Sequence, residues 1–200
     1  MKYNNYDSVL LETKRLILNK GTIKDYLRVY EYDFKKLMCI DDMIEFEKED
    51  EKKIKSWFNG GINKYFKKLV KAHMFDWIIY LDNDAIGNIL TGDEDIENNS
   101  IELIFNIHPN YWGKGYAPEA AASVLDYLFK IGYDNIICGY IDGDKKSKRV
   151  LSKLGFKPFE IKSDAVEIEK GALADKYVMI MTKENWLSRT TKIAKIKESV

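Results

Sequence analysis

Two glycines placed one residue apart are the clearest sign of chemistry in this sequence. Gly113 and Gly115 lie between a strand that stops at Pro109 and a helix that starts near Ala117. Without Cβ atoms, they let the backbone adopt unusual dihedral angles and let a bulky anion approach the main chain. The first amides of the following helix have no intrahelical acceptors, and the helix dipole adds roughly half a positive charge there. The segment therefore predicts a diphosphate-binding loop at a helix N-terminus.

A glycine pair is weak evidence alone, because a plain tight strand-to-helix connection uses the same residues. A dinucleotide-binding fingerprint needs a third glycine, and the chain has Pro118 near that position. A Walker loop needs Ser or Thr after Gly-Lys, and the chain has Gly115 there. Pro118 is typical of a first helical turn, and Glu119 suits the positive end of a helix. Both support a helix N-terminus directly after the loop.

The elements that must position this loop follow from hydrophobic periodicity and turn residues. Thr22 is expected to cap a helix, with Asp25 completing a short capping box. Apolar stripes predict helices over 23–38, 54–69 (weakened by Gly60-Gly61), 117–128 and 147–154, the last ended by Gly155. Strands are expected over 9–18, 73–81, 85–91, 100–107, 136–141 and 176–182, with a turn at Asn83-Asp84 and an acidic loop after Thr91. This order favours a mixed sheet covered by helices, with the ligand site where a strand feeds a helix.

Composition narrows the function classes. The 200 residues suit a single domain, which we place at 1–186, followed by a basic tail at 187–200. Lysine plus arginine (32) balances aspartate plus glutamate (32), so no global field favours nucleic acid. Cys39 and Cys138 stand in no metal-binding or redox motif. A hydrophilic start and no apolar run near 18 residues indicate neither signal peptide nor membrane span, so we expect a cytoplasmic protein.

The residues around the glycines carry a specific resemblance. The run Asn110-Tyr111-Trp112-Gly113-Lys114-Gly115-Tyr116-Ala117-Pro118-Glu119-Ala120 resembles the acetyl-CoA signature of GNAT N-acetyltransferases, in the branch that includes ribosomal-protein N-terminal (alanine) acetyltransferases. Residues 11–18 resemble the branch's opening strand, residues 85–89 its strand after the hairpin and residues 147–156 its closing motif, so the resemblance covers nearly the whole chain. It implies the α/β GNAT fold, a single domain whose mixed central sheet is flanked by helices and has splayed central parallel strands.

The chain departs from that branch at two positions. Asn110 stands where the family's loop usually begins with glutamine or arginine. Asp144 stands where an asparagine often touches the coenzyme arm. The first change affects the edge of the loop, whereas the second places a carboxylate at a coenzyme contact.

The resemblance also implies a mechanism and a set of site residues. An amine attacks the thioester of acetyl-CoA directly, with no covalent enzyme intermediate and no metal, and needs an oxyanion donor and a proton for the leaving thiolate. Ser147 is the candidate proton donor, with Tyr140 and Tyr133 as alternatives, and a backbone amide at 105–107 is the candidate oxyanion donor. Glu102 is the candidate base, with Asp142 and Asp144 as alternatives. The expected coenzyme contacts are Phe105, Asn106, Ile107, Trp112, Gly113, Lys114, Gly115, Tyr116, Ala117, Asp144, Ser147 and Lys148.

Each role has a plainer alternative. Ser147 suits a helix N-cap, Glu102 a solvent-facing strand residue, and Tyr140 the core. His108, beside Pro109, is expected at the surface. The acidic run at 93–97 either attracts a cationic acceptor or is simply solvated.

The acceptor and the oligomeric state stay open at this point. A protein N-terminus and a small-molecule amine are both used by relatives, and the chain could be a monomer or a homodimer. A catalytically silent acyl-CoA-binding sensor is the main alternative function. A nucleotide-phosphate binder is a third.

Overall fold

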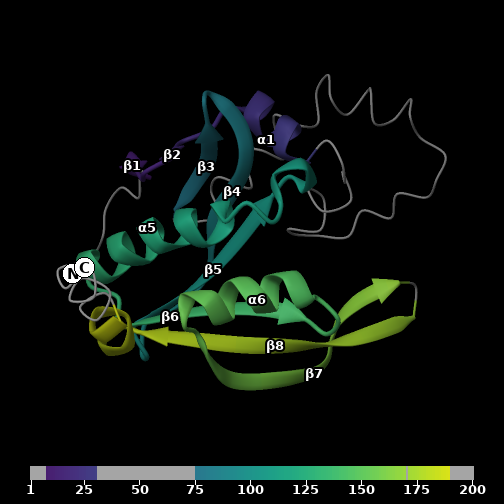
Figure 1. Cartoon of the computed structure of the whole chain (residues 1–200). Coiled ribbons are helices and arrows are strands. Elements are labelled where there is room, and N and C mark those ends of the chain that lie inside the picture. The colour runs from purple at the N-terminus through teal and green to yellow at the C-terminus, as the bar shows by residue number, and fades with distance from the viewer. Residues whose placement is uncertain (1–7, 31–74, 170, 190–200) are drawn as a thin grey trace, which may run out of the picture. The chain divides into compact units, whose positions relative to one another are not determined.

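Eight strands form one mixed sheet in the computed structural model, which describes residues 8–30, 75–169 and 171–189. The strands lie in the order β1-β2-β3-β4-β5-β6-β8-β7 (Figure 1). Their bounds are β1 Leu11–Glu12, β2 Ile17–Asn19, β3 Asp76–Leu81, β4 Asp84–Asp95, β5 Ser100–Ile107, β6 Asn135–Ile141, β7 Lys157–Glu169 and β8 Ala172–Thr182. The described helices are α1 Ile23–Tyr30, the 3-10 turn η2 Pro109–Tyr111, α5 Tyr116–Ile131 and α6 Lys145–Leu154, and residues 183–189 are also helical.

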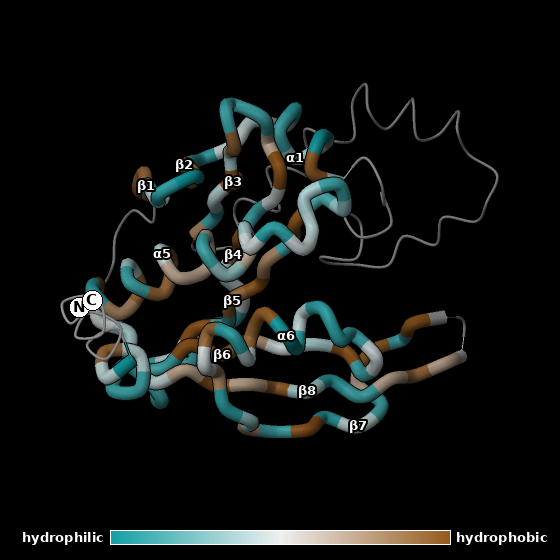
Figure 2. The backbone as a smooth tube through the Cα atoms, viewed as in Figure 1, coloured by the Kyte–Doolittle hydropathy of each residue, from teal (hydrophilic) through white to brown (hydrophobic). Residues whose placement is uncertain are grey.

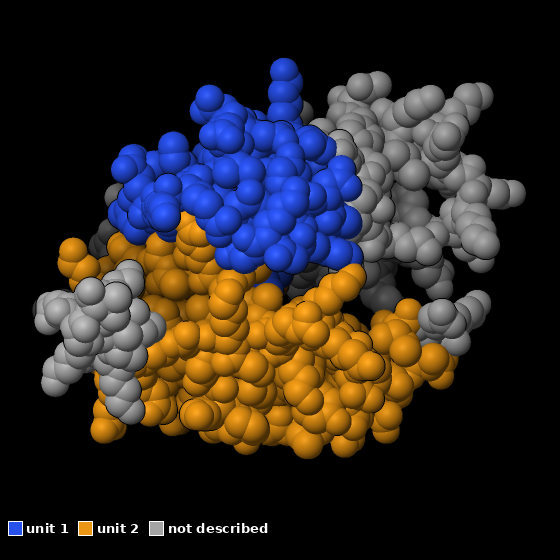
Figure 3. Space-filling view, viewed as in Figure 1, with its two compact units in different colours: residues 1–91, 105–116 blue, residues 92–104, 117–200 orange. Residues whose placement is uncertain are grey.

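The chain divides into two compact units, which are described separately below (Figure 3). Unit 1 comprises residues 1–91 and 105–116, and unit 2 comprises residues 92–104 and 117–200. The predicted glycine loop belongs to unit 1, and the predicted start of the closing motif belongs to unit 2.

The core of unit 1 forms where α1 packs on the β3–β4 hairpin. Tyr26 and Val29 of α1 lie against Ile78 of β3 and Leu90 of β4, and all four are almost fully buried. One half of the predicted capping box is present, because the Asp25 carboxylate accepts the Thr22 N–H at 2.7 Å. The Thr22 hydroxyl donates to the same carboxylate at 2.7 Å instead of accepting the Asp25 N–H, which bonds the Thr22 carbonyl. The cap therefore fixes where α1 begins.

The single opening strand predicted for residues 9–18 is wrong. Two short antiparallel strands, β1 and β2, flank a tight turn instead. The Thr13 hydroxyl accepts hydrogen bonds from the N–H groups of Leu16 (2.9 Å) and Arg15 (3.3 Å). This local side-chain bond competes with strand pairing and bends the chain.

The core of unit 2 is built on α5 and the β6–β8 pair. The predicted stripe of α5 is buried, at Ala120, Ala121, Val124, Leu125 and Leu128. Both α5 and β6 contain hydrophobic stretches, whereas α6 is more hydrophilic (Figure 2). The helix α6 packs on β6 and ends at Gly155, whose φ of 90° confirms the predicted left-handed C′ residue.

The ladder between β5 and β6 ends early. Three parallel pairs are formed, from Ser100 with Asn135 to Glu102 with Ile137. Beyond them, β6 pairs with β8 as far as Ile141. The ladder therefore stops before residues 105–107, where the splay was predicted, and those residues belong to unit 1.

Other observed boundaries differ from the predicted ones by a few residues, and one strand was not predicted. The turn expected at Asn83-Asp84 lies at Asp82 and Asn83, which have φ of 50° and 69°. The strand expected to end at Thr91 continues to Asp95, so part of the acidic run lies on β4 and not in a loop. No strand was predicted for β7. The helices predicted beyond residue 30 and over 54–69, with Cys39, His73 and the tail after residue 189, lie outside the described residues.

Candidate functional site

The glycine loop turns through two residues with left-handed backbone angles. It leaves η2 through Trp112, and both Gly113 (φ 74°) and Gly115 (φ 82°) adopt left-handed angles before α5 begins at Tyr116. A Cβ added to Gly113 would meet no atom within 4 Å, so this position is glycine because of its φ and not because of crowding. Pro118 occupies the first turn of α5, as predicted. The main chain of the loop is therefore open on this side to a ligand.

Side chains on either side tie the loop to the end of β5. The Trp112 indole N–H donates to the Ile107 carbonyl at 2.6 Å, although the side chain is 42% exposed. The Nδ1 atom of His108 accepts the backbone N–H of Asn110, so His108 caps η2. The backbone N–H of His108 donates to the Ile86 carbonyl. His108 is buried, so its expected surface position is wrong. Its Nδ1 atom is engaged in positioning the loop.

A series of hydrogen bonds through charged side chains links α1 to Tyr111, the residue before Trp112. The Tyr111 hydroxyl donates to Asp84, and the Arg28 guanidinium donates to both oxygens of that carboxylate at 3.3 Å. The hydrogen bond from Tyr111, followed by Arg28, lowers the pKa of Asp84. The same hydrogen bond raises the pKa of Tyr111. Sequence reasoning missed Asp84 and Arg28, because their contacts with the loop join positions far apart in the chain.

The start of α6 groups three other predicted residues. Asp144 is the N-cap, accepting the N–H groups of Lys146 and Ser147. The Ser147 hydroxyl donates to the second Asp144 oxygen at 2.7 Å. The N-cap interpretation of Ser147 is therefore wrong, since Ser147 occupies the third helical position. Asp144 and Lys148 are exposed, and Ser147 is half-buried.

Glu102 forms an ion pair within unit 2. Its Oε1 atom lies 2.9 Å from Lys176 Nζ, and the Glu102 side chain is 22% exposed. Its Oε2 atom lies over Gly92, where an added Cβ would approach to 2.6 Å. Glu102 is therefore a partly exposed strand residue held by an ion pair. Lys176 was missed, because it is 74 positions away in sequence.

The other candidates have structural partners. Tyr133 and Tyr140 are buried, Tyr133 donates to Glu94 at 2.7 Å, and Tyr140 stacks on Tyr177 with ring centroids 5.2 Å apart. The core interpretation of Tyr140 is confirmed. Burial, followed by the nearby Glu102 charge, raises the pKa of the Cys138 thiol to about 12.

The acidic run at 93–97 also serves the fold. Asp95 accepts the N–H groups of Glu97 and Asn98 and the Asn98 side-chain amide, which closes the turn after β4. The hydrogen bond from the Asn98 side chain is the main cause that lowers the pKa of Asp95. Glu94 accepts the Tyr133 hydroxyl.

The described residues contain neither of two features that would point to another function. No group of three or more His, Cys, Asp or Glu residues with metal-binding geometry is present in them. Nor do they contain a helix with the length and hydrophobicity needed to cross a bilayer.

Comparison with known proteins decides the family. A family profile described as "Acetyltransferase (GNAT) domain" matches residues 15–157. The chain belongs to the GNAT acetyltransferase family. It is 33% identical over 154 residues to the uncharacterized N-acetyltransferase YnaD of Bacillus subtilis, covering 74% of this chain and 82% of that protein. The expected enzyme class is thereby confirmed, and members of the GNAT family transfer the acetyl group of acetyl-CoA.

Solved structures share the GNAT fold. Mycobacterium smegmatis RimJ in complex with CoA-disulfide aligns with a TM-score of 0.67 at 18% identity, covering 84% of this chain and 82% of that one. The ribosomal-protein-S5-alanine acetyltransferase of Vibrio fischeri aligns with a TM-score of 0.63 at 17% identity, covering 90% and 99%. At these identities the likeness shows the fold, which includes the predicted mixed sheet.

The predicted site residues of this GNAT protein fall into two sets. Phe105, Asn106, Ile107 and residues 112–116 belong to unit 1, with Ile107 buried and Phe105 and Asn106 half-buried. Glu102, Ala117, Asp144, Ser147 and Lys148 belong to unit 2. Their contacts with coenzyme and acceptor stay predictions.

Proposed function

We propose that this GNAT protein transfers an acetyl group from acetyl-CoA to a primary amine, on a protein N-terminus or a small molecule, by direct attack of the amine on the thioester. One observation carries the proposal: Gly113 and Gly115 both have left-handed φ in a loop that opens directly into the N-terminus of α5. A diphosphate needs several convergent N–H donors, and such a loop supplies them.

The coenzyme fits the residues present. The diphosphate would accept main-chain N–H groups between Gly113 and Ala117, where the α5 dipole adds positive potential. Lys114 is exposed, but its ammonium donates to the Asn110 carbonyl at 3.2 Å, so it contributes its charge without leaving the loop. Lys148 and its basic neighbours on α6 are exposed and would add charge-assisted bonds of about 1.5–3 kcal/mol each to phosphate oxygens.

In the transfer step, the amine nitrogen forms a bond with the thioester carbonyl carbon and the C–S bond breaks. The amine gives its proton to Glu102, directly or through water, and the thiolate takes a proton from Ser147. A backbone amide at 105–107 stabilises the oxyanion. The ion pair with Lys176 engages Oε1 of Glu102 and leaves Oε2 as the acceptor for the amine proton.

Asp144 limits the proposed proton donor. Its carboxylate already accepts the single Ser147 hydroxyl proton at 2.7 Å. For Ser147 to protonate a thiolate, this bond must break, and a serine alkoxide beside a carboxylate is unfavourable. We therefore expect Ser147 to be a less efficient proton donor beside Asp144 than beside the asparagine that is usual in the GNAT branch this chain resembles.

The test of the proposed function is a thiol-release assay with acetyl-CoA and a panel of amines that includes peptides with free N-termini. Release that depends on both substrates, with formation of the acetylated amine, is the expected result. Tight binding of acetyl-CoA with no release against any amine would instead support a silent acyl-CoA-binding module. Thermal stabilisation by ATP or NAD, and none by CoA, would contradict coenzyme A binding itself.

A further inference from the structure

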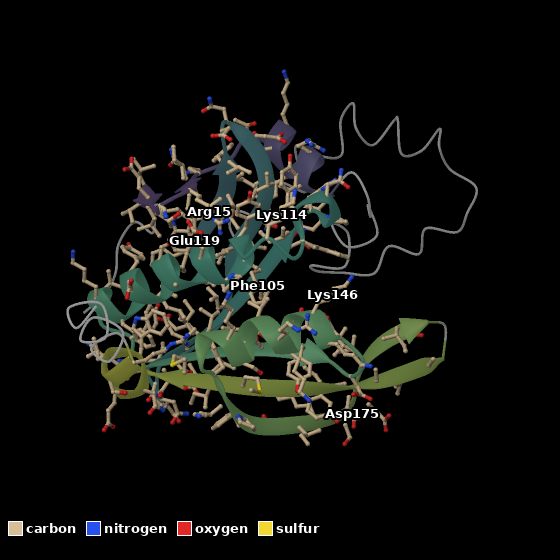
Figure 4. The ribbon with its side chains drawn as sticks, in the orientation of Figure 1. Arg15, Phe105, Lys114, Glu119, Lys146 and Asp175 are labelled. Atoms are coloured by element: carbon tan, nitrogen blue, oxygen red, sulfur yellow. The ribbon has the colours of Figure 1, made fainter. Side chains whose placement is uncertain are left out.

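Arg15 contacts the glycine loop through its guanidinium group. The Nη1 atom donates to the Lys114 carbonyl at 3.1 Å (Figure 4). The guanidinium carbon lies 4.5 Å from the centre of the Tyr116 ring. A Cβ added to Gly115 would lie 3.5 Å from Nη2, so the guanidinium covers the side of Gly115 on which a side chain would project.

The bond to Lys114 has a consequence for the next amide. The Lys114 carbonyl and the Gly115 N–H belong to one planar trans peptide unit, so they point in opposite directions. With the carbonyl held toward Arg15, the Gly115 N–H must point away from it. Glycine has unusually free dihedral angles, and this peptide has a glycine on its C-terminal side, so an external anchor is what sets its orientation.

The backbone that carries the exposed Arg15 side chain is held in a tight turn. Arg15 lies in the Thr13–Leu16 turn, where the Thr13 hydroxyl accepts its N–H at 3.3 Å and the Leu16 N–H at 2.9 Å. Leu16 is buried and fixes the turn to the core of unit 1. A guanidinium donates in its plane while its face rests on an aromatic ring, and a lysine ammonium lacks this combination.

We propose that Arg15 is a positioning residue for the coenzyme: it turns the Lys114–Gly115 peptide so that the Gly115 N–H faces the diphosphate, and it fixes the loop against Tyr116. The inference rests on the proposed function, because it assumes that the loop binds the diphosphate of acetyl-CoA. Arg15 acts from the carbonyl side of the loop, so it needs no contact with the phosphate.

The test measures CoA binding by calorimetry for four proteins. Arg15→Ala should weaken CoA binding about tenfold, which is the loss expected for one oriented hydrogen bond to a charged group. Arg15→Lys should recover only part of this loss. Lys14→Ala is the matched control, because Lys14 is the exposed basic neighbour in the same turn, and it should bind within twofold of the wild type.

A spectroscopic readout separates positioning from general damage. In protein labelled with ¹⁵N-glycine, CoA should shift the amide signals of both Gly113 and Gly115. In Arg15→Ala the shift of Gly115 should be largely lost and that of Gly113 kept. If Arg15→Ala fails to fold, the same readout in Arg15→Lys keeps the test open, because an ammonium lacks the planar donor geometry and the Gly115 shift should be reduced while that of Gly113 is kept.

The outcomes distinguish the two proposals. Wild-type protein that binds CoA, with Arg15→Ala binding equally well and showing an unchanged Gly115 shift, would overturn the role of Arg15 and leave the proposed function intact. Wild-type protein that binds no CoA would overturn the proposed function and this inference with it.

Discussion

The glycine loop of unit 1 and the start of α6 in unit 2 achieve their geometry in different ways. The loop is shaped by its own backbone angles and by anchors at Trp112, His108 and Tyr111, of which Tyr111 bonds to the distant Asp84. The start of α6 is shaped by one exposed carboxylate, Asp144, which holds two amides and a hydroxyl. A backbone-built site demands particular residue types, whereas a side-chain-built site changes its chemistry with a single substitution.

The largest effect is expected for Gly113→Val, which tests whether the loop depends on its backbone conformation. A β-branched residue at φ 74° is strained, so the loop must change its conformation and lose its converging amides. We expect CoA affinity to fall at least about 100-fold, the loss of two or more charge-assisted hydrogen bonds, measured by calorimetry. Gly171→Val is the matched control, since Gly171 has φ 80° and equally open surroundings in the β7–β8 turn. Equal affinity in both variants and the wild type would remove the loop from the account.

Glu102 tests the side-chain part of unit 2. Glu102→Gln keeps the shape but removes the proton acceptor, and we expect kcat/KM for the amine to fall about 100-fold, at the low end for a general base. Gly92→Ala keeps the carboxylate but pushes its Oε2 atom away, because the new Cβ would lie 2.6 Å from it. A smaller fall in the second variant, with unchanged CoA affinity in both, is expected. Full activity of Glu102→Gln would assign the base to another residue.

Ser147 and Asp144 form a pair that a double-mutant cycle can resolve. Ser147→Ala should lower kcat about tenfold at saturating acetyl-CoA, because the thiolate loses its proton donor. Asp144→Asn keeps a good N-cap but holds the hydroxyl less strongly, so kcat should rise a few-fold. In the Ser147→Ala background the second change should have no effect on kcat. A rise of the same size in both backgrounds would show that Asp144 acts independently of Ser147.

The smallest effect is expected at Asp84, which anchors Tyr111. The pKa of Asp84 is lowered in the folded protein, so the carboxylate contributes stability above its unfolded pKa, and this is lost as pH falls through the folded value. The side chain is 43% exposed, so screening limits the contribution to less than about 1 kcal/mol. Asp84→Asn should therefore unfold at slightly lower urea at pH 7, with the difference shrinking below about pH 4. A difference that grows toward acid pH would contradict this assignment.

The sequence predicted best those elements whose signals are local. The strand β5 was predicted at its observed bounds, and the buried stripe of α5 and the Gly155 cap follow from periodicity and one glycine. The strand β7 alternates apolar and polar residues only in two short stretches, 159–162 and 166–169, and it was missed because polar residues and a register shift separate them. Its apolar side chains Phe159, Ile161 and Ile168 are also exposed, so the alternation marks no buried face.

The site was predictable in the same uneven way. The glycines and Pro118 identify the loop from sequence, because glycine permits left-handed backbone angles and proline suits a first helical turn. The contacts of the other site residues come from distant positions in the chain. His108 bonds to Ile86, Glu102 pairs with Lys176, and Tyr111 bonds to Asp84. No local pattern announces such contacts.

The most direct test of the central claim is the hydrogen exchange of individual main-chain amides from Gly113 to Ala117, measured with and without saturating CoA. If these amides bind the diphosphate, their exchange should slow markedly on addition of CoA, while amides in the β7–β8 turn should not change. Saturation of the protein with CoA without any slowing at these amides would contradict the account.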